Sequence, residues 1–183
     1  MVRIIAGRAR GLLLQVPEGQ TVRPADRVRE ALFNVLAHRL HVDFNGARVL
    51  DLFAGAGTLG LEAMSRGAGE LTAVEANPCV ARVLAANVRR LGEARVVKAE
   101  AVAFLAGATA QWDLVFLDPP YRQGLIAPVL AGLAAGRVAP GGVVVVEHPA
   151  DEALNPPDSL GISFQRIYGG TAITILGAAA PAT

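Results

Sequence analysis

A glycine-rich turn between an apolar strand and an apolar helix is the feature that most constrains the fold of this chain. Residues 48–62 read RVLDLFAGAGTLGLE, with glycines at Gly55, Gly57 and Gly60. Because glycine has no Cβ, a turn of this kind lets backbone N–H groups approach a ligand closely. Its spacing satisfies the G-x-G-x-x-G fingerprint of NAD and FAD sites, but the same device suits S-adenosylmethionine. The glycines alone therefore leave both ligands open.

Strand and helix patterns alternate along the rest of the chain. Further short apolar strands are predicted over 70–75, 94–99, 113–117 and 143–147. Helices are predicted over about 26–41, 78–91, 101–105 and 124–135. A closing β-hairpin within 164–176 would make the last strand antiparallel. The pattern predicts an α/β fold with a doubly wound, mostly parallel seven-stranded sheet whose last strand is antiparallel.

The N-terminal residues differ in composition from the rest. Residues 3–17 alternate arginines and glycines with apolar residues, which predicts a small extended arm with a turn near 7–11. Residues 1–30 hold six arginines against three carboxylates, although the net charge of the whole chain is only +1. These arginines are Arg3, Arg8, Arg10, Arg23, Arg27 and Arg29. Such an arm would suit a phosphate backbone, and a merely solvated surface explains it equally well.

Composition argues against several classes of protein. The chain has 183 residues, which favours one domain around one core. It is 52% apolar, but no segment approaches the ~18 uninterrupted apolar residues of a membrane helix. The single Cys79 excludes an intramolecular disulfide and is consistent with a cytoplasmic protein. The three histidines are scattered, so no metal site is expected.

Three carboxylates lie at the ends of predicted strands. Asp51 lies beside the glycine turn, where it could accept a hydrogen bond from the α-ammonium group of a methionine moiety or brace the loop. Glu75 lies 18 positions beyond Gly57, where a carboxylate binds ribose hydroxyls in NAD and S-adenosylmethionine sites alike. Glu100 could meet an adenine edge or be an ordinary surface residue. Together they indicate an adenosine-type ligand without naming it.

The segment Asp118, Pro119, Pro120 and Tyr121 closes the strand predicted over 113–117. Two consecutive prolines hold it extended at the sheet edge where ligands bind in open α/β folds. The Asp118 carboxylate and the Pro119 carbonyl could accept both hydrogens of an exocyclic amino group, while Tyr121 stacks on the base. The alternative is a strand-ending turn with a core tyrosine.

The order of these motifs resembles class I S-adenosylmethionine-dependent methyltransferases that modify exocyclic amino groups. The segments RIIAGRARG, RPADRVREALFNVL, LDLFAGAGTLGLEAMSRGA and YGGTAITIL are similar to the bacterial RsmD-type family. That family methylates the N2 amino group of one guanine in 16S ribosomal RNA. The resemblance covers residues 3–176 and implies a Rossmann-like fold with a methyltransferase domain over 46–177. Residues 1–45 would form an RNA-contacting extension, and 178–183 a frayed tail.

The resemblance also implies residue roles. The cofactor would contact Asp51, Phe53, Ala54, Gly55, Gly57, Thr58, Glu75, Ala76, Asn77, Glu100, Ala101 and Asp118. The target base would be held by Asp118, Pro119, Pro120 and Tyr121. RNA would contact Arg3, Arg8, Arg10, Arg23, Arg27, Arg29 and Arg122. The family commonly carries an aspartate where this chain has Glu100.

Direct transfer of a methyl group to the guanine nitrogen is the expected mechanism, without a metal or a covalent enzyme intermediate. The protein would mainly supply proximity and orientation, and the base would have to be unstacked first. Expected partners are 16S ribosomal RNA or a small-subunit assembly particle, with the protein as a monomer and no membrane association. Adenine-N6 methylation of DNA or RNA is the nearest alternative. An NAD-binding oxidoreductase or a nucleotide-binding module is more remote, since neither accounts for the Asp-Pro-Pro-Tyr segment.

Overall fold

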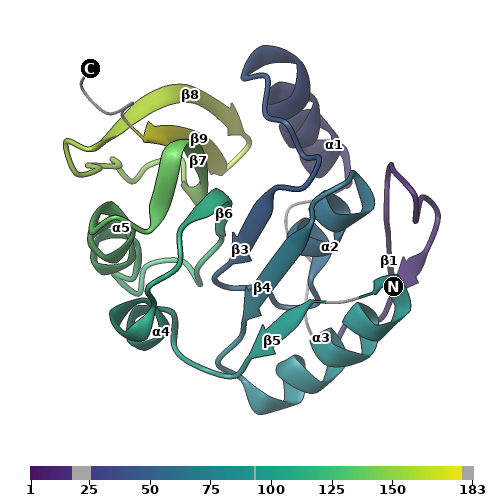
Figure 1. Cartoon of the computed structure of the whole chain (residues 1–183). Coiled ribbons are helices and arrows are strands. Elements are labelled where there is room, and N and C mark those ends of the chain that lie inside the picture. Colours follow the sequence, from purple (N-terminus) through teal and green to yellow (C-terminus); the bar gives the residue numbers. More distant parts are fainter. Residues whose placement is uncertain (18–25, 93, 179–183) are drawn as a thin grey trace.

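A seven-stranded sheet forms the centre of the molecule (Figure 1). The computed structural model describes residues 1–17, 26–92 and 94–178. The strands lie in the order β5-β4-β3-β6-β7-β9-β8. They are β3 (Arg48–Asp51), β4 (Glu70–Val74), β5 (Arg95–Val97), β6 (Trp112–Leu117), β7 (Val138–Pro149), β8 (Leu160–Tyr168) and β9 (Thr171–Ala178).

The direction of the strands confirms the predicted sheet. β3 runs parallel to β4 and β6, β4 to β5, and β6 to β7, whereas β9 is antiparallel to both β7 and β8. β7 is longer than the strand predicted over 143–147, because Val138 already pairs with Trp112 and Pro149 still pairs with Thr171. The last strand of the sequence therefore lies inside the sheet, between β7 and β8.

Helices cover both faces of the sheet (Figure 1). They are α1 (Asp26–Asn34), α2 (Thr58–Ser65), α3 (Pro78–Leu91), α4 (Ala101–Gly107) and α5 (Ile126–Ala134). One hydrophobic cluster joins α1, α2 and α3 to one face, and a second joins α4 and α5 to the other. Neighbouring residues of β3 point to opposite faces, so that Val49 belongs to the first cluster and Leu50 to the second. This is the doubly wound arrangement that the alternating pattern predicts.

The α-helix predicted over 26–41 ends at Asn34, and a different type of helix follows it. After Asn34 the chain forms a π-helix, η1 (Val35–Arg39). There the Leu40 N–H donates to the Val35 carbonyl at 3.0 Å, and His41 then takes a positive φ of 52°. A π-turn places side chains differently from an α-helix, so the regular spacing of apolar residues does not extend to residue 41.

The N-terminal arm packs tightly on the domain. Its strands β1 (Val2–Arg3) and β2 (Leu13–Leu14) form an antiparallel pair, which confirms the predicted extended arm with a turn between its two halves. Ile4 and Leu14 are fully buried in the cluster that contains α1 and α2. The arm therefore contributes to the core and is more than a surface extension.

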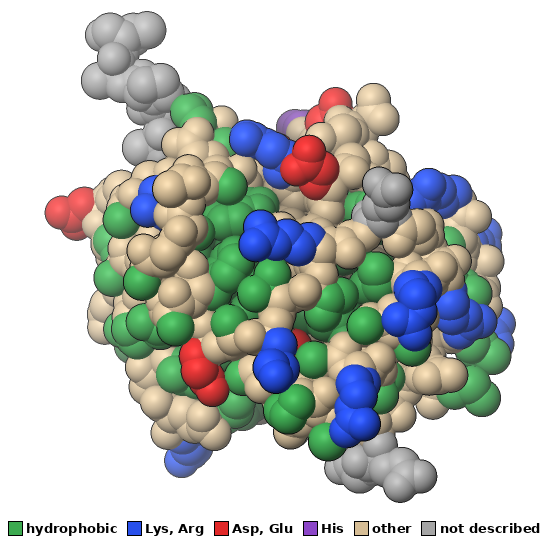
Figure 2. Space-filling model, turned by 60° about the horizontal axis from the view of Figure 1, so that its bottom comes forward, with side chains coloured by type: hydrophobic (Ala, Val, Ile, Leu, Met, Phe, Trp, Pro, Cys, Tyr) green, Lys and Arg blue, Asp and Glu red, His purple; other side chains and the backbone are tan. Residues whose placement is uncertain are grey.

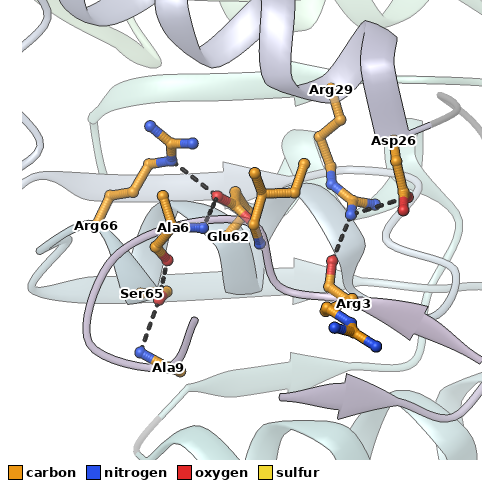
Figure 3. A network of polar contacts seen from close by, with 9 residues as sticks. Arg3, Ala6, Ala9, Asp26, Arg29, Glu62, Ser65 and Arg66 are labelled. Carbon is orange, nitrogen blue, oxygen red and sulfur yellow. Dashed lines mark hydrogen bonds and ion pairs between the residues drawn. The ribbon is translucent and has the colours of Figure 1, made fainter. Parts of the chain in front are cut away.

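Buried polar groups of α2 fix the arm in place (Figure 3). The Glu62 carboxylate accepts from the Ile5 N–H at 2.7 Å, the Ala6 N–H at 3.1 Å and Arg66 Nε at 2.9 Å. Ser65 Oγ donates to the Ala6 carbonyl at 2.5 Å and accepts from the Ala9 N–H at 3.0 Å (Figure 3). These bonds satisfy arm backbone that has no sheet partner of its own.

Within the described ranges, no helix has the length and apolar character needed to cross a membrane.

Candidate active site

A cavity of about 500 Å³ opens at the carboxyl ends of β3, β4, β5 and β6. Ligands in open α/β sheets bind at this edge, and the volume is typical of a cofactor site. The cavity is lined by every predicted cofactor residue except Gly57, together with Pro119 and Pro120. Its walls also include Val16, Leu52, Ala56, Leu59, Ala99, Gln123 and Leu125, which the sequence analysis did not single out. Strand ends far apart in the sequence thus meet in one site.

Asp51 is a buried carboxylic acid at the base of the cavity, with only 2% of its surface exposed. Its Oδ2 accepts from the Gly60 N–H at 3.1 Å, so the residue does brace the glycine loop. Burial raises the pKa of Asp51 to about 7, and the nearby charge of Glu75 acts in the same direction against hydrogen bonds from Gly60 and Phe53. A cation bound beside Asp51 would stabilise the ionised form of its carboxyl group.

Glu75 connects the loops that follow β3 and β4. Its Oε2 accepts from the Gly55 N–H at 3.0 Å, and its Oε1 accepts from the Asn77 N–H at 2.8 Å. Each carboxylate oxygen has two lone pairs, so both oxygens retain capacity for hydroxyl donors from the cavity. Glu100 is exposed and precedes α4, and it also lines the cavity.

The glycines of the turn have different roles. Gly55 has a φ of +53° and lines the cavity, and a Cβ at this position would meet only the Phe53 carbonyl oxygen at 4.0 Å. Gly57, with a φ of +86°, would instead place a Cβ 2.7 Å from Leu84 Cδ1. Gly57 therefore packs closely against α3 and does not line the cavity, so its predicted contact with the cofactor stays a prediction.

The Asp118–Pro120 segment forms the wall of the cavity beyond β6. Pro119 is buried, Asp118 is half-buried and Pro120 is exposed. Tyr121 turns away from this cavity and borders a second, open hollow of about 400 Å³ with Arg122, Pro149, Ala150, Asp151 and Gly170. The four residues thus separate two neighbouring spaces.

The predicted RNA-binding arginines do not form one group. Arg3, Arg8, Arg10, Arg27 and Arg122 are exposed, and Arg122 Nη2 lies 3.2 Å from Asp151 Oδ2 at the rim of the second hollow. Arg23 lies outside the described residues.

The prediction that Arg29 contacts RNA is wrong for this structure, because its side chain is only 1% exposed. Its Nη2 donates to the Arg3 carbonyl at 2.5 Å and to Asp26 Oδ1 at 3.2 Å (Figure 3). Burial lowers the pKa of Arg29, although the carboxylates of Asp26 and Glu62 act in the opposite direction. The residue holds the arm to α1 and is closed off from RNA. Its spacing from Leu32 and Leu36, on the buried face of the helix, is the sequence signal that indicates this role.

Arg8 lies at the edge of the domain opposite the cavity. Its N–H donates to the Ser65 carbonyl at 2.8 Å and its Nη2 to the Leu91 carbonyl at 3.4 Å, at the carboxyl ends of α2 and α3. Exposed Arg82, Arg89 and Arg90 of α3 extend this basic surface. Figure 2 shows Lys and Arg side chains gathered on the right of the view, the side on which Figure 1 shows α3 and the arm.

Among the described residues, no group of three or more His, Cys, Asp or Glu side chains is arranged to hold a metal ion.

A family model, curated relatives and a solved structure that match this chain agree with one another. The model of the family described as Conserved hypothetical protein 95 matches residues 2–177. The chain is 40% identical to ribosomal RNA small subunit methyltransferase D of Escherichia coli K12 over 176 residues, which cover 93% of this chain and 87% of that protein. It is 37% identical to the Haemophilus influenzae protein of the same name, over 92% of this chain and 89% of the relative. The solved structure of E. coli YhhF, described as a candidate methyltransferase, matches with a TM-score of 0.87 and 37% identity over 98% of both chains.

Proposed function

This chain belongs to the family described as Conserved hypothetical protein 95, the RsmD-type family, and from that premise we propose that it methylates the N2 amino group of a guanine in 16S ribosomal RNA. S-adenosylmethionine is the proposed methyl donor. The observation that carries this proposal is the position of Asp118, Pro119 and Pro120 in the wall of the same cavity as Asp51 and Glu75. One space thus holds groups suited to an adenosine-type cofactor and groups suited to an exocyclic amine.

The residues of the cavity fit the cofactor. The Asp51 carboxyl, buried and with a raised pKa, would be stabilised in its ionised form by an α-ammonium group. The free lone pairs of Glu75 would accept from ribose hydroxyls, and Glu100 with Ala101 would lie at the adenine. No side chain of the described residues lies within 4 Å of a Cβ built on Gly55, so the space over it would admit close contact with its backbone. When bound, S-adenosylmethionine supplies a methyl group already activated by its sulfonium.

The protein contributes position and hydrogen bonding. The Asp118 carboxylate and the Pro119 carbonyl would accept the two hydrogens of the guanine amino group, which orients the nitrogen lone pair. Prolines 119 and 120 keep this segment extended, since neither can rotate about φ. Fixed orientation of two reactants is worth roughly 7–11 kcal/mol in favourable cases.

Phosphate contacts would come from the exposed arginines. Arg8 and Arg10 of the arm and Arg82, Arg89 and Arg90 of α3 are all exposed, and none takes part in the ion pairs of the described residues. Because Arg8 lies at the edge opposite the cavity, RNA bound there and in the cavity at once would have to extend along α3. A folded RNA or an assembly particle meets that requirement better than a short single strand.

Substitution of Asp118 tests the proposal. We expect Asp118→Ala to reduce methyl transfer to undermethylated small-subunit particles at least 100-fold, because one acceptor for the amine is lost, while the Kd for S-adenosylmethionine changes little. The matched control is Asp158→Ala, which removes an exposed carboxylate away from the cavity. Unchanged turnover of Asp118→Ala would exclude the proposed role. Mass analysis of the product nucleosides separates the two amines, and N6-methyladenosine would replace the guanine assignment with the adenine one.

A further inference from the structure

The hydroxyl of Tyr121 is held by two strands of the sheet. It lies 3.0 Å from Glu147 Oε1 of β7 and 2.8 Å from Thr171 Oγ1 of β9. A carboxylate only accepts, so the tyrosine hydroxyl donates to Glu147 and the threonine hydroxyl donates to the tyrosine oxygen. The chain of hydrogen bonds therefore has one direction, from Thr171 through Tyr121 to Glu147.

Glu147 is an unusual residue for a central strand. It is only 4% exposed, and it directly follows the buried run of four valines in β7. A buried carboxylate is costly unless donors satisfy it, and the tyrosine hydroxyl is one such donor. An apolar residue at this position would stabilise the strand more than a buried carboxylate does. Its presence beside the Asp118–Tyr121 segment indicates a role in the site.

The two bonds fix the ring of Tyr121. Bonds to the hydroxyl fix the position of its oxygen and thereby the first side-chain torsion. Because a phenolic O–H lies in the plane of the ring, bonds at both its donor and its acceptor side also favour one orientation of that plane. The residue itself lies in a loop after β6, whereas its partners lie in strands. Thr171 begins β9 directly after the Gly169–Gly170 turn and pairs across from Pro149. A rigid part of the sheet thus determines where a loop side chain lies.

We propose that Glu147 and Thr171 are positioning residues that hold the Tyr121 ring as the fixed wall against which the acceptor base stacks. The base would occupy the hollow bordered by Tyr121, Pro149, Ala150 and Gly170, with its amino group toward Asp118. The closing hairpin β8–β9 is then part of the acceptor site. This inference rests on the proposed methyl transfer to an RNA base.

A double-mutant cycle tests the inference. Tyr121→Phe, Glu147→Gln and Thr171→Val should each lower kcat/KM for RNA about 5- to 30-fold, the range for one or two lost hydrogen bonds, with the Kd for S-adenosylmethionine within about twofold of wild type. In the Tyr121→Phe background, Glu147→Gln and Thr171→Val should have no further effect, because the hydroxyl through which they act is absent. Gln165→Ala, which removes a bond to Thr174 in the same hairpin, is the control and should leave kcat/KM unchanged. Equal losses in both backgrounds would overturn the inference.

A second readout does not depend on activity. The chain has two tyrosines, so Tyr168→Phe leaves Tyr121 as the only one. In that protein, labelled at the tyrosine Cζ carbon, Glu147→Gln and Thr171→Val should each move the Cζ resonance. If the wild-type protein transfers no methyl group, the proposed function fails while this spectrum still reports on the hydrogen bonds. If it is active but neither the resonance nor kcat/KM changes, the inference alone fails.

Discussion

The Asp51 carboxyl group would change its protonation state when the proposed cofactor binds. Buried without a cation, its carboxyl retains a proton up to a pKa of about 7, compared with 3.8 for an ordinary aspartate. Between those pH values the folded protein holds a proton that the unfolded chain has released. The contribution of Asp51 to the free energy of unfolding therefore falls as pH rises from about 4 to about 7, by at most about 1.4 kcal/mol per pH unit.

If Asp51 binds the ammonium group of the proposed cofactor, cofactor affinity should depend on pH. Since an ammonium group requires the ionised carboxylate, we expect affinity for S-adenosylmethionine to rise up to tenfold per pH unit below about pH 7. Binding at pH 6 should release a proton. Calorimetry at pH 5.5, 6.5 and 7.5 in two buffers of different ionisation enthalpy measures both effects.

Asp51→Asn is the control for this prediction, because it retains an acceptor for the Gly60 N–H. The variant should bind the cofactor weakly, without the pH dependence between 5.5 and 7.5. An affinity of the wild-type protein that is flat across this range, with no proton release, would show that Asp51 does not contact the ammonium group.

At single positions, sequence predicts which residues come together where a residue lies at the end of a strand. Asp51, Glu75 and Asp118 line one cavity because parallel strands bring their carboxyl ends to one edge. Val16 also lines that cavity, but it arrives there through the path of the arm across α3, which no local pattern encodes. The contact of Tyr121 with Glu147 and Thr171 joins residues 26 and 50 positions apart, and the spacing of residues in the sequence does not predict it either.

At the scale of elements, the N-terminal arm shows how a tight turn can determine how closely one segment packs on a helix. Gly7 and Gly11 both have positive φ values, of +80° and +88°. A Cβ on Gly7 would lie 1.9 Å from the Ser65 carbonyl oxygen, whereas a Cβ on Gly11 would meet no atom of the described residues within 4 Å. The two positions share backbone strain but differ in contact with α2.

This pair provides a matched experiment on stability. Gly11→Ala should lower the free energy of unfolding by about 1 kcal/mol, which is the cost of an alanine at positive φ. Gly7→Ala should lower it by at least about 3 kcal/mol, because the arm must also move off α2 and expose Ile4. Chemical denaturation followed by circular dichroism measures both. Equal losses would mean that the close approach to Ser65 contributes nothing.

Among the elements, α3 was the easiest to predict and η1 the hardest. Asn77 Oδ1 accepts from the Cys79 and Val80 N–H groups at 2.9 and 3.3 Å, Pro78 begins the helix, and Gly92 follows it with a φ of +129°. These signals are local, so the predicted bounds 78–91 are confirmed. The π-helix after Asn34 carries no such signal, since Val35 and Leu36 suit an α-helix equally well.

At the scale of the whole molecule, the basic surface and the cavity occupy different edges. If RNA follows the surface between them, Arg10→Ala with Arg89→Ala should weaken RNA binding and lower the dependence of log Kd on log salt by about 0.7–0.9 per lost phosphate contact. Filter binding between about 50 and 200 mM salt measures this slope. Cofactor affinity should not change.

Arg166→Ala is a suitable control, because this exposed arginine lies on β8 at the other end of the sheet, over the Tyr168 ring. A salt slope that falls equally per charge removed in both proteins would assign the effect to net charge and not to this surface.

The position of β9 has a consequence for synthesis on the ribosome. Every other strand of the sheet leaves the exit tunnel before it, yet β9 lies between β7 and β8, so β8 has no sheet neighbour until residues 171–178 emerge. The strands and loops around Asp51 and Glu75 are by then already translated, whereas Thr171 arrives only with this final strand. A nascent chain stalled before β9 should expose the unpaired edge of β7, which is prone to aggregation. Translation thus completes the half of the molecule that we propose to bind the methyl donor before the half that we propose to hold the base.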